Sequence, residues 1–306
     1  MIRLGLCCIF VKEDIRFRTT TAAFLQRLQQ RSGDPFEYLA RIVFDNILAL
    51  QKAITFCAQN HIGCFRITST FLPLATYPDF NYTIDDLPNA ESLKNDLKKC
   101  QQIAADAEIR LSFHPDQFVL LNSPKEDVIE KSIASLEYHS QLAEIFGADV
   151  INIHGGGGYG NKEKALERLV NNFERLSPAI KQRLTLENDD KVYTPADLLP
   201  ICQQLNIPLV YDVHHHRCLS DGNNIEDTTA ATLKTWNRPP LFHISSPKEG
   251  WKGKNPQRHH DYINPHDMPS CWKNIDNLTI EVEAKAKELA VKRLRKQLLK
   301  RQWPLW

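Results

Sequence analysis

Short apolar runs alternate with longer amphipathic stretches from one end of the chain to the other. Each run is apolar at almost every position rather than at every second one, which predicts a strand covered on both faces. The longer stretches repeat their apolar residues with the spacing of a helix. This order is typical of βα units and a parallel sheet. The eight predicted strands lie near Leu4–Phe10, Cys64–Ile67, Ile109–Phe113, Val150–Ile153, Leu184–Leu186, Leu209–Asp212, Leu241–Ile244 and Leu278–Val282.

Several of the helical stretches have clear start signals. Asp34-Pro35, Ser123-Pro124 and Thr194-Pro195 each place an N-cap side chain before a proline that suits the first helical position. The predicted helices cover Phe36–Gln59, Glu91–Ala107, Val128–Phe146, Lys162–Leu176 and Glu283–Leu299.

Eight βα units are compatible with a closed (β/α)8 TIM barrel and with an open doubly wound sheet. A barrel needs about 250 residues, and the chain has 306 without an internal repeat or linker. We therefore expect one α/β domain over residues 1–306, with a basic C-terminal helix over about 284–301. Thr68–Asn89 and Ser245–Met268 are longer than a compact barrel needs, which makes them candidate substrate loops.

The third to eighth predicted strands each finish in a His, Asp or Glu that an apolar strand has no structural reason to carry. One strand-end histidine is usually a hydrogen-bonded core or rim residue, but six coincidences are hard to explain in that way. The C-terminal ends of barrel strands meet in one mouth, whereas an open sheet would spread them along an edge. The recurrence therefore favours the barrel. In strand order the residues are His114, His154, Glu187, Asp212 with His215, His243, and Glu283.

Imidazoles beside carboxylates form the mixed ligand set that holds Zn²⁺ or Mn²⁺. Asp212-x-x-His215 and His259-x-Asp261 place the two kinds of side chain next to each other. The candidates outnumber the ligands that one ion can use, so we predict a cluster of two or three ions, with Glu187 and Glu283 able to bridge them. The nine predicted ligands are His114, His154, Glu187, Asp212, His215, His243, His259, Asp261 and Glu283.

Other residues near these candidates have simpler interpretations. His214 and His216 flank His215 and, by strand alternation, should point away from it as supporting or rim residues; His260 is interpreted in the same way. The Gly155–Gly158 run lacks the Lys-Ser/Thr of a phosphate-binding P-loop. We expect a flexible turn that lets the backbone approach a metal or substrate closely.

Composition adds limits on location and partners. The chain has no apolar run long enough for a membrane span and begins without a signal-peptide pattern, so we expect a cytoplasmic monomer with no membrane partner. Its eight cysteines include no Cys-x-x-Cys pair and are expected to be reduced core residues. The net charge of +1 neither requires nor excludes a nucleic-acid partner, although the last helix is rich in Lys and Arg.

Clustered divalent ions in an open mouth suit phosphoester hydrolysis, because they activate water near neutral pH and stabilise both oxygens of a displaced phosphodiester. A sugar isomerase on the same barrel is the main alternative. Such sites usually carry fewer histidines and a base or lysine above a small substrate, and no predicted strand ends in lysine. A DNA-binding barrel without catalytic activity is the third hypothesis.

At this point the sequence resembles a known family, the ultraviolet-damage endonucleases, which are distantly related to endonuclease IV. The resemblance covers nearly the whole chain, and the His-Pro-Asp-Gln stretch with the ordered series of ligands makes it specific. The stretches that carry it are Phe65–Thr70 with Pro73–Ala75, Leu111–Pro124, Asn152–Gly156, Leu186–Asp189, Asp212–His215, Phe242–Pro247 and Glu283–Lys285.

The resemblance implies an enzyme that cuts double-stranded DNA immediately 5′ of ultraviolet photoproducts, with abasic sites as further substrates, and leaves a 3′-hydroxyl. It implies Mn²⁺ as the cofactor, in two or three sites, with Zn²⁺ or Mg²⁺ as alternatives. It assigns the nine predicted ligands to these ions, and it makes Glu187, Asp212, His215 and Glu283 the residues that hold the catalytic ions.

The resemblance also implies that Gln117 and Phe118 probe the lesion, as a wedge that fills the duplex while damaged bases turn out. Without it, Phe118 would be expected to plug the loop against the barrel. Two positions depart from the family pattern. Some relatives have lysine where this chain has Leu241, and many have tyrosine where it has Phe118. The first departure bears on metal affinity and the second on lesion preference.

Overall fold

Eight parallel strands form the centre of the molecule. The computed structural model describes all residues from Met1 to Trp306. Each strand is short and is followed along the chain by a helix or a long loop, as the alternating sequence pattern predicts. The strands are β1 (Arg3–Cys7), β2 (Cys64–Ile67), β3 (Arg110–Phe113), β4 (Val150–His154), β5 (Leu184–Glu187), β6 (Leu209–Val210), β7 (Leu241–Ile244) and β8 (Thr279–Val282).

The strands pair in the order β6-β5-β4-β3-β2-β1-β8-β7. The remaining gap, between β6 and β7, is closed by a parallel bridge between Asp212 and His243. The amide of His243 donates to the carbonyl of Tyr211 across 3.0 Å at the same place. The closed barrel is therefore confirmed, and the open doubly wound sheet is wrong.

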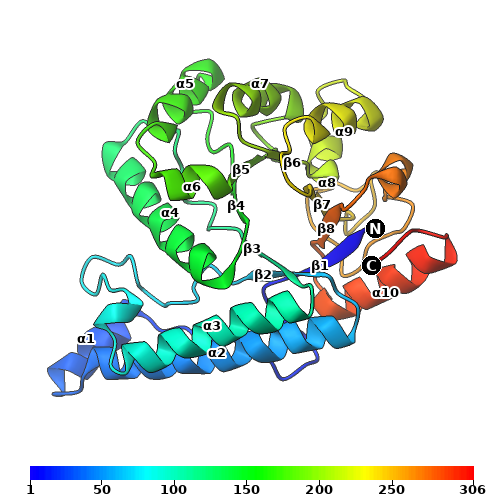
Figure 1. Cartoon of the computed structure of the whole chain (residues 1–306). Coiled ribbons are helices and arrows are strands. Elements are labelled where there is room, and N and C mark those ends of the chain that lie inside the picture. The colour runs from blue at the N-terminus through cyan, green and yellow to red at the C-terminus, as the bar shows by residue number, and fades with distance from the viewer.

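Helices surround the barrel, and a group of three extends from one side of it (Figure 1). The two chain ends lie side by side at one end of the barrel, where the amide of Ile2 donates to Pro304 and the amide of Trp306 donates to Ile2. The helices are α1 (Ala22–Gln30), α2 (Pro35–Gln59), α3 (Ala90–Asp106), α4 (Glu126–Phe146), α5 (Lys162–Phe173), α6 (Pro178–Arg183), α7 (Pro195–Leu205), α8 (Val213–Cys218), α9 (Ile225–Leu233) and α10 (Lys287–Lys300), with short 3-10 turns η1 (Ile84–Asp86) and η2 (Ser270–Asn274).

Two of the three predicted Pro-N1 starts are confirmed. The side chain of Asp34 caps α2 and that of Thr194 caps α7, each before a proline. Ser123-Pro124 is not a helix start, because the Ser123 hydroxyl instead accepts from the amide of Lys125 in a local turn and α4 begins at Glu126. A helix from Glu283 is also wrong, since α10 begins only at Lys287.

The hydrophobic core lies between the barrel and its helices, where 67 buried residues form one cluster. The lumen of the barrel is different, because several inward-facing strand positions are polar. Asn152 donates to Glu187 across 2.6 Å and accepts from Thr185 at 2.9 Å, all inside the barrel. The expectation of strands apolar at nearly every position is thus wrong for the inner faces of these strands.

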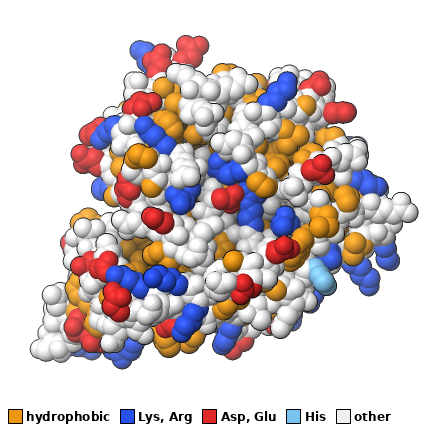
Figure 2. Space-filling model, viewed as in Figure 1, with side chains coloured by type: hydrophobic (Ala, Val, Ile, Leu, Met, Phe, Trp, Pro, Cys, Tyr) orange, Lys and Arg blue, Asp and Glu red, His pale blue; other side chains and the backbone are white.

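The surface carries both signs of charge. The face drawn in Figure 2 mixes Lys and Arg side chains with Asp and Glu, as a net charge of +1 predicts. None of the helices is both long enough and apolar enough to cross a bilayer.

Candidate metal centre

Glu187 lies at the centre of the predicted ligand set. It ends β5, and its carboxylate is almost completely buried. Its Oε2 lies 2.9 Å from Nε2 of His114 and 4.0 Å from Nε2 of His154. Its Oε1 lies 2.9 Å from Nδ1 of His243 and 3.6 Å from Nδ1 of His215. Four imidazoles from four different segments therefore face one carboxylate.

A second group forms around Glu283, which follows β8. Its Oε1 lies 3.6 Å from Nδ1 of His243, and Asp212 completes a potential ligand group with these two residues. The structure thus brings seven of the nine predicted ligands into three overlapping groups. Within each group, the ligand atoms lie within 4.8 Å of one another. The groups are His114 with Glu187 and His243, His154 with Glu187 and His215, and Asp212 with His243 and Glu283.

Two buried atoms in these groups fit a cation. Oδ2 of Asp212 and Nδ1 of His154 have no hydrogen-bond partner, although both are shielded from solvent. An unpaired buried polar atom is costly, and a cation would relieve the cost for the carboxylate. The mixture of imidazole nitrogen and carboxylate oxygen is the donor set of Zn²⁺ and Mn²⁺.

The electrostatics of the groups also suit cations. Burial alone would raise the pKa of Glu187, but His243, His154 and His114 hold that pKa well below its usual value. Burial alone would lower the pKa of His215, yet Asp212, Glu187 and Glu283 raise it to about 9. Burial would likewise lower the pKa of His243, yet Glu187 and Glu283 raise it. Without ions, protons on His215 and His243 therefore balance the carboxylates. Cations would displace these protons, so binding should strengthen with rising pH.

The last two predicted ligands lie at the edge. Nδ1 of His259 is 3.9 Å from Oε2 of Glu283 and 3.2 Å from the hydroxyl of Ser245, so His259 borders the second group. Asp261 is exposed and belongs to none of the three groups; its carbonyl accepts from Ala286.

His214 and His216 are placed differently from the expectation. The chain turns into α8 after Asp212, whose Oδ1 caps the helix by accepting from the amide of His215 at 2.8 Å. Strand alternation therefore does not apply. His216 is held between the Tyr211 hydroxyl at 2.7 Å and Asp221 at 2.8 Å, which fits the supporting role expected of it. His214 is fully buried, and neither of its ring nitrogens has a partner.

Sequence reasoning missed a layer of polar residues directly below the ligands. Arg66, Ser112 and Glu281 are buried on β2, β3 and β8. Ser112 precedes His114 by two positions and Glu281 precedes Glu283 by two, so each shares the inner face with a predicted ligand. That spacing of two is the signal that could have identified Ser112 and Glu281; Arg66 has no predicted ligand two positions further on.

The glycine run after β4 is held tightly in place. The side chain of Asn122 donates to the carbonyls of Gly155 and Gly157, both at 2.8 Å. A Cβ on Gly156, whose φ is +88°, would lie 2.3 Å from Oδ1 of Asn122. The backbone here approaches Asn122 closely, and these contacts contradict a flexible turn. Close approach of this backbone to a metal or substrate stays a prediction.

The two predicted lesion-probing residues lie on the loop after β3, close to His114 in sequence. Gln117 and Phe118 are exposed, and Phe118 has 72% of its surface accessible. The amide of Phe118 donates to Oδ1 of Asp116 at 3.0 Å, which orders the loop. An exposed ring does not plug the loop against the barrel, so the alternative interpretation of Phe118 is wrong.

Leu241, where some relatives have lysine, is fully buried. It forms a small apolar cluster with Val150 and Val210. These three residues occupy alternate inner positions of their strands, two before His243, Asn152 and Asp212 respectively. Position 241 therefore offers no charged group to the ligands above it.

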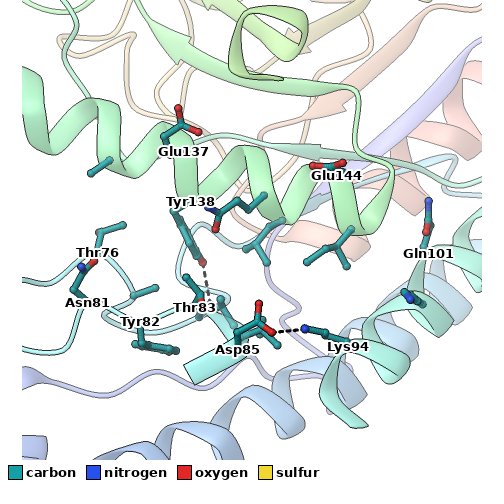
Figure 3. A pocket seen from close by; sticks show the side chains of 18 residues that line it. Thr76, Asn81, Tyr82, Thr83, Asp85, Lys94, Gln101, Glu137, Tyr138 and Glu144 are labelled. Carbon is teal, nitrogen blue, oxygen red and sulfur yellow. Dashed lines mark hydrogen bonds and ion pairs between the residues drawn. The ribbon is translucent and has the colours of Figure 1, made fainter. Parts of the chain in front are cut away.

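Two cavities differ in their position relative to the predicted ligands. One of about 680 Å³ lies outside the barrel between α3, α4 and the loop after β2 (Figure 3). Tyr138 and the Asp85–Lys94 ion pair line it, but none of the predicted ligands does.

The other cavity, of about 510 Å³, adjoins the predicted ligands. It is lined by Lys248, Gln257, Arg258, His259 and Lys285, and so includes three cations and no acid. The amide of Lys248 donates to the carbonyl of Arg258 at 2.7 Å, and that of Lys285 donates to His260 at 3.1 Å. The backbone of the long loop after β7 therefore places the three cations beside His259.

Comparison with known proteins agrees with this geometry. The model of the UV-endonuclease UvdE family matches residues 2–302. A UV DNA damage endonuclease of Bacillus cereus (strain G9842) is 33% identical over 287 residues, which is 90% of this chain and 87% of the relative. One from Nostoc sp. (strain PCC 7120) is 33% identical, covering 95% of this chain and 89% of the relative.

Solved structures give the same result. The crystal structure of SacUVDE has a TM-score of 0.86 at 28% identity, covering 99% of this chain and all of that one. Endonuclease IV from Thermus thermophilus (TM-score 0.61, 13% identity, 97% and 99% coverage) and a D-psicose 3-epimerase from Clostridium cellulolyticum (0.57, 12%, 84% and 94%) share the fold. The chain belongs to the UV-endonuclease UvdE family, whose members are nucleases that act on the phosphodiester bonds of ultraviolet-damaged DNA.

Proposed function

We propose that this chain hydrolyses the phosphodiester immediately 5′ of ultraviolet photoproducts in double-stranded DNA, and leaves a 3′-hydroxyl. Abasic sites are a second class of substrate. The observation that carries the proposal is the convergence of seven His, Asp and Glu side chains on three overlapping groups at one mouth of the barrel. Membership of the family supports the type of DNA damage.

The nine predicted ligands would hold two or three divalent ions, with Mn²⁺ proposed and Zn²⁺ or Mg²⁺ as alternatives. Glu187 contacts members of two groups through its separate oxygens and is suited to bridge two ions. Glu283 reaches His243 through Oε1 and His259 through Oε2, which suits it to the same role. Such ions, once bound, supply a Lewis acid that activates water and neutralises charge on the phosphate.

The protein side chains would orient the DNA around this centre. Lys248, Arg258 and Lys285 line a cavity without acids beside His259, so phosphates next to the cleaved bond are proposed to bind there. Gln117 and Phe118 are exposed on a loop that starts at His114, and would enter the duplex as damaged bases leave the stack. Turning a base out of the duplex costs less free energy when the lesion already disrupts stacking.

Two cations of α10, Lys292 and Arg293, are less suited to bind DNA. The ammonium of Lys292 lies 5.7 Å from the ring of Phe56, and the guanidinium of Arg293 lies 4.6 Å from that of Tyr262. These side chains cover the outside of the barrel. Lys285, just before α10, is the cation of this basic segment that reaches the cavity beside His259.

A nicking assay tests the proposal. Irradiated, abasic and intact supercoiled DNA would be incubated with the purified chain and Mn²⁺, before and after chelation. We expect nicking of irradiated DNA that requires metal, and products that a polymerase extends directly. Equal nicking of intact DNA would contradict the lesion specificity. Interconversion of ketoses and aldoses without any nicking would instead establish the sugar-isomerase alternative.

A further inference from the structure

The imidazole of His243 is fully buried and has a carboxylate at each ring nitrogen. Nδ1 faces the predicted metal centre, 2.9 Å from Oε1 of Glu187 and 3.6 Å from Oε1 of Glu283. Nε2 points the other way, into the barrel, and lies 3.1 Å from Oε2 of Glu281. The two nitrogens therefore have different environments, and only Nδ1 is directed at other predicted ligands.

Glu281 is held rigidly below this ring. Its side chain is 2% exposed. Nε of Arg66 donates to Oε2 of Glu281 at 2.6 Å, and the Ser112 hydroxyl donates to its Oε1. A Cβ on Gly5 would lie 3.1 Å from Cγ of Glu281, so glycine at position 5 leaves space for this carboxylate. No ligand group includes Glu281.

A neutral imidazole binds a cation through the nitrogen that lacks a proton, and the other nitrogen keeps its proton and needs an acceptor. Glu281 is that acceptor for Nε2. Nη2 of Arg66 also lies 3.0 Å from Nε2 and can only donate. Its protons have carboxylate acceptors, however, because Nη2 contacts Glu281 and lies 2.8 Å from Oε1 of Glu283, which leaves Nε2 free to donate to Glu281. Arg66 thus keeps Glu281 charged and in place.

We propose that Glu281 is a positioning residue of the metal centre: it accepts the Nε2 proton of His243 and so directs the Nδ1 lone pair to the bound cation. This inference rests on the proposed role of His243 as a ligand. It assigns Arg66 and Ser112 the task of fixing Glu281. It also explains why a barrel lumen, which is usually filled with apolar side chains, here contains a buried ion pair.

A nuclear magnetic resonance measurement tests the tautomer directly. The chain would be labelled with ¹⁵N-histidine and loaded with Zn²⁺, which is diamagnetic. The ring signals of His243 would be assigned by comparison with a His243→Gln sample. We expect a protonated Nε2 and a Nδ1 shifted by the metal. A Zn²⁺-shifted Nε2 with the proton on Nδ1 would overturn the proposal, whereas a wild-type chain that binds no Zn²⁺ would overturn the metal centre itself.

Variants test the consequence for binding. Glu281→Gln removes the charged acceptor, and we expect Zn²⁺ and Mn²⁺ affinity, measured by titration against a competing chelator, to fall by about 10- to 100-fold. Asp149→Asn is the matched control, because it also removes a carboxylate from a barrel arginine. Asp149 pairs with Arg110 at 2.8 Å but contacts no predicted ligand.

The control separates positioning from general destabilisation. Both variants should lower the unfolding temperature of the metal-free protein, but only Glu281→Gln should weaken metal binding. If Glu281→Gln does not fold, Ser112→Ala provides the test, since it removes one hydrogen bond to Glu281 without leaving a charge unpaired. Equal metal affinity in wild type and the folded Glu281 or Ser112 variant would refute the proposed role.

Discussion

The amide of Phe118 donates to the carboxylate of Asp116 at 3.0 Å, and this bond holds a phenyl ring with 72% of its surface exposed at the mouth of the barrel. Single exposed aromatic side chains are common on protein surfaces, so a role of Phe118 is inferred from its place near a predicted ligand. The loop that carries Phe118 begins at His114, a predicted ligand. Recognition of the lesion and cleavage of the DNA backbone would therefore be linked through the few residues between His114 and Phe118.

Phe118→Ala should weaken binding to irradiated duplex while leaving the fold intact. Stacking of one base on an aromatic ring is worth about 1–3 kcal/mol, which predicts a rise in Kd of about 5- to 150-fold. The free energy of unfolding should change by less than about 0.5 kcal/mol, because the ring is exposed. Phe44→Ala, which removes a 44% exposed ring from the remote α2, is the control. Equal losses in the two variants would contradict a specific role of Phe118.

Removal of the central carboxylate should abolish cleavage through loss of metal. Glu187 contacts members of two ligand groups, so Glu187→Gln should lower bound Mn²⁺ and reduce kcat/KM by more than the roughly 100-fold expected for loss of a supporting residue. Metal content by mass spectrometry and nicking of irradiated DNA are the measurements. Full metal content with full activity in this variant would exclude the proposed centre.

The metal-free protein should lose stability as the pH rises from about 6.5 towards 9. The pKa of His215 is raised to about 9 in the folded chain, against about 6.5 when unfolded. A histidine whose pKa is raised on folding stabilises the fold at pH values below its pKa in the unfolded chain. This contribution disappears as the pH rises through its pKa in the folded chain. Thermal unfolding across this range is the measurement.

At acidic pH, the stability of the metal-free protein changes with pH in the opposite direction. The pKa values of Glu187 and Glu283 lie well below their usual range in the folded chain. Their contribution is present above about pH 4.5 and is lost as pH falls towards the folded values. Burial also lowers the pKa of His139, His154 and His214, so their contribution is lost as the pH falls below about 6.5. Metal-free stability should therefore be greatest at about pH 6.5. Saturating Zn²⁺ should remove the alkaline loss, since ions replace the protons; an identical profile with and without metal would contradict this account.

Charge removal at the basic cavity should weaken DNA binding in a salt-dependent way. Each phosphate contact contributes about 0.9 to the slope of log K against log salt concentration for duplex DNA. Lys248→Gln and Lys285→Gln should therefore each lower the slope by about that amount. Lys296→Gln on α10 is the control, because Lys296 is exposed and lies outside the cavity. A larger fall in this slope for Lys296→Gln would indicate that α10, and not the cavity, contacts the DNA.

Two glycines on one loop separate conformational strain from close contact. Gly156 and Gly160 have φ of +88° and +78°, so alanine at either position costs about 1–2 kcal/mol of backbone strain. A Cβ on Gly156 would also collide with Asn122, whereas nothing lies within 4 Å of a Cβ on Gly160. Chemical denaturation should show the larger loss for Gly156→Ala. Equal losses would mean that Asn122 can move aside freely.

Sequence alone determined the order of the elements and most of the ligand set. Apolar runs and helical periods depend on neighbours along the chain, so the eight strands and the five longest helices could be located from the pattern. The strand-end residues from His114 to Glu283 could be identified because a charged residue at the end of an apolar run is locally conspicuous. Closure of a barrel then followed from their recurrence.

Tertiary structure decided what depends on contacts between distant segments. The short helix after Asp212, which reorients His214 and His216, begins where Asp212 pairs with His243 and closes the barrel. Arg66 and Glu281, which are 215 residues apart, become partners only inside the closed barrel. The role of a polar residue in the middle of a strand cannot be inferred from the sequence, because it depends on which face of the strand is enclosed and which charge lies opposite.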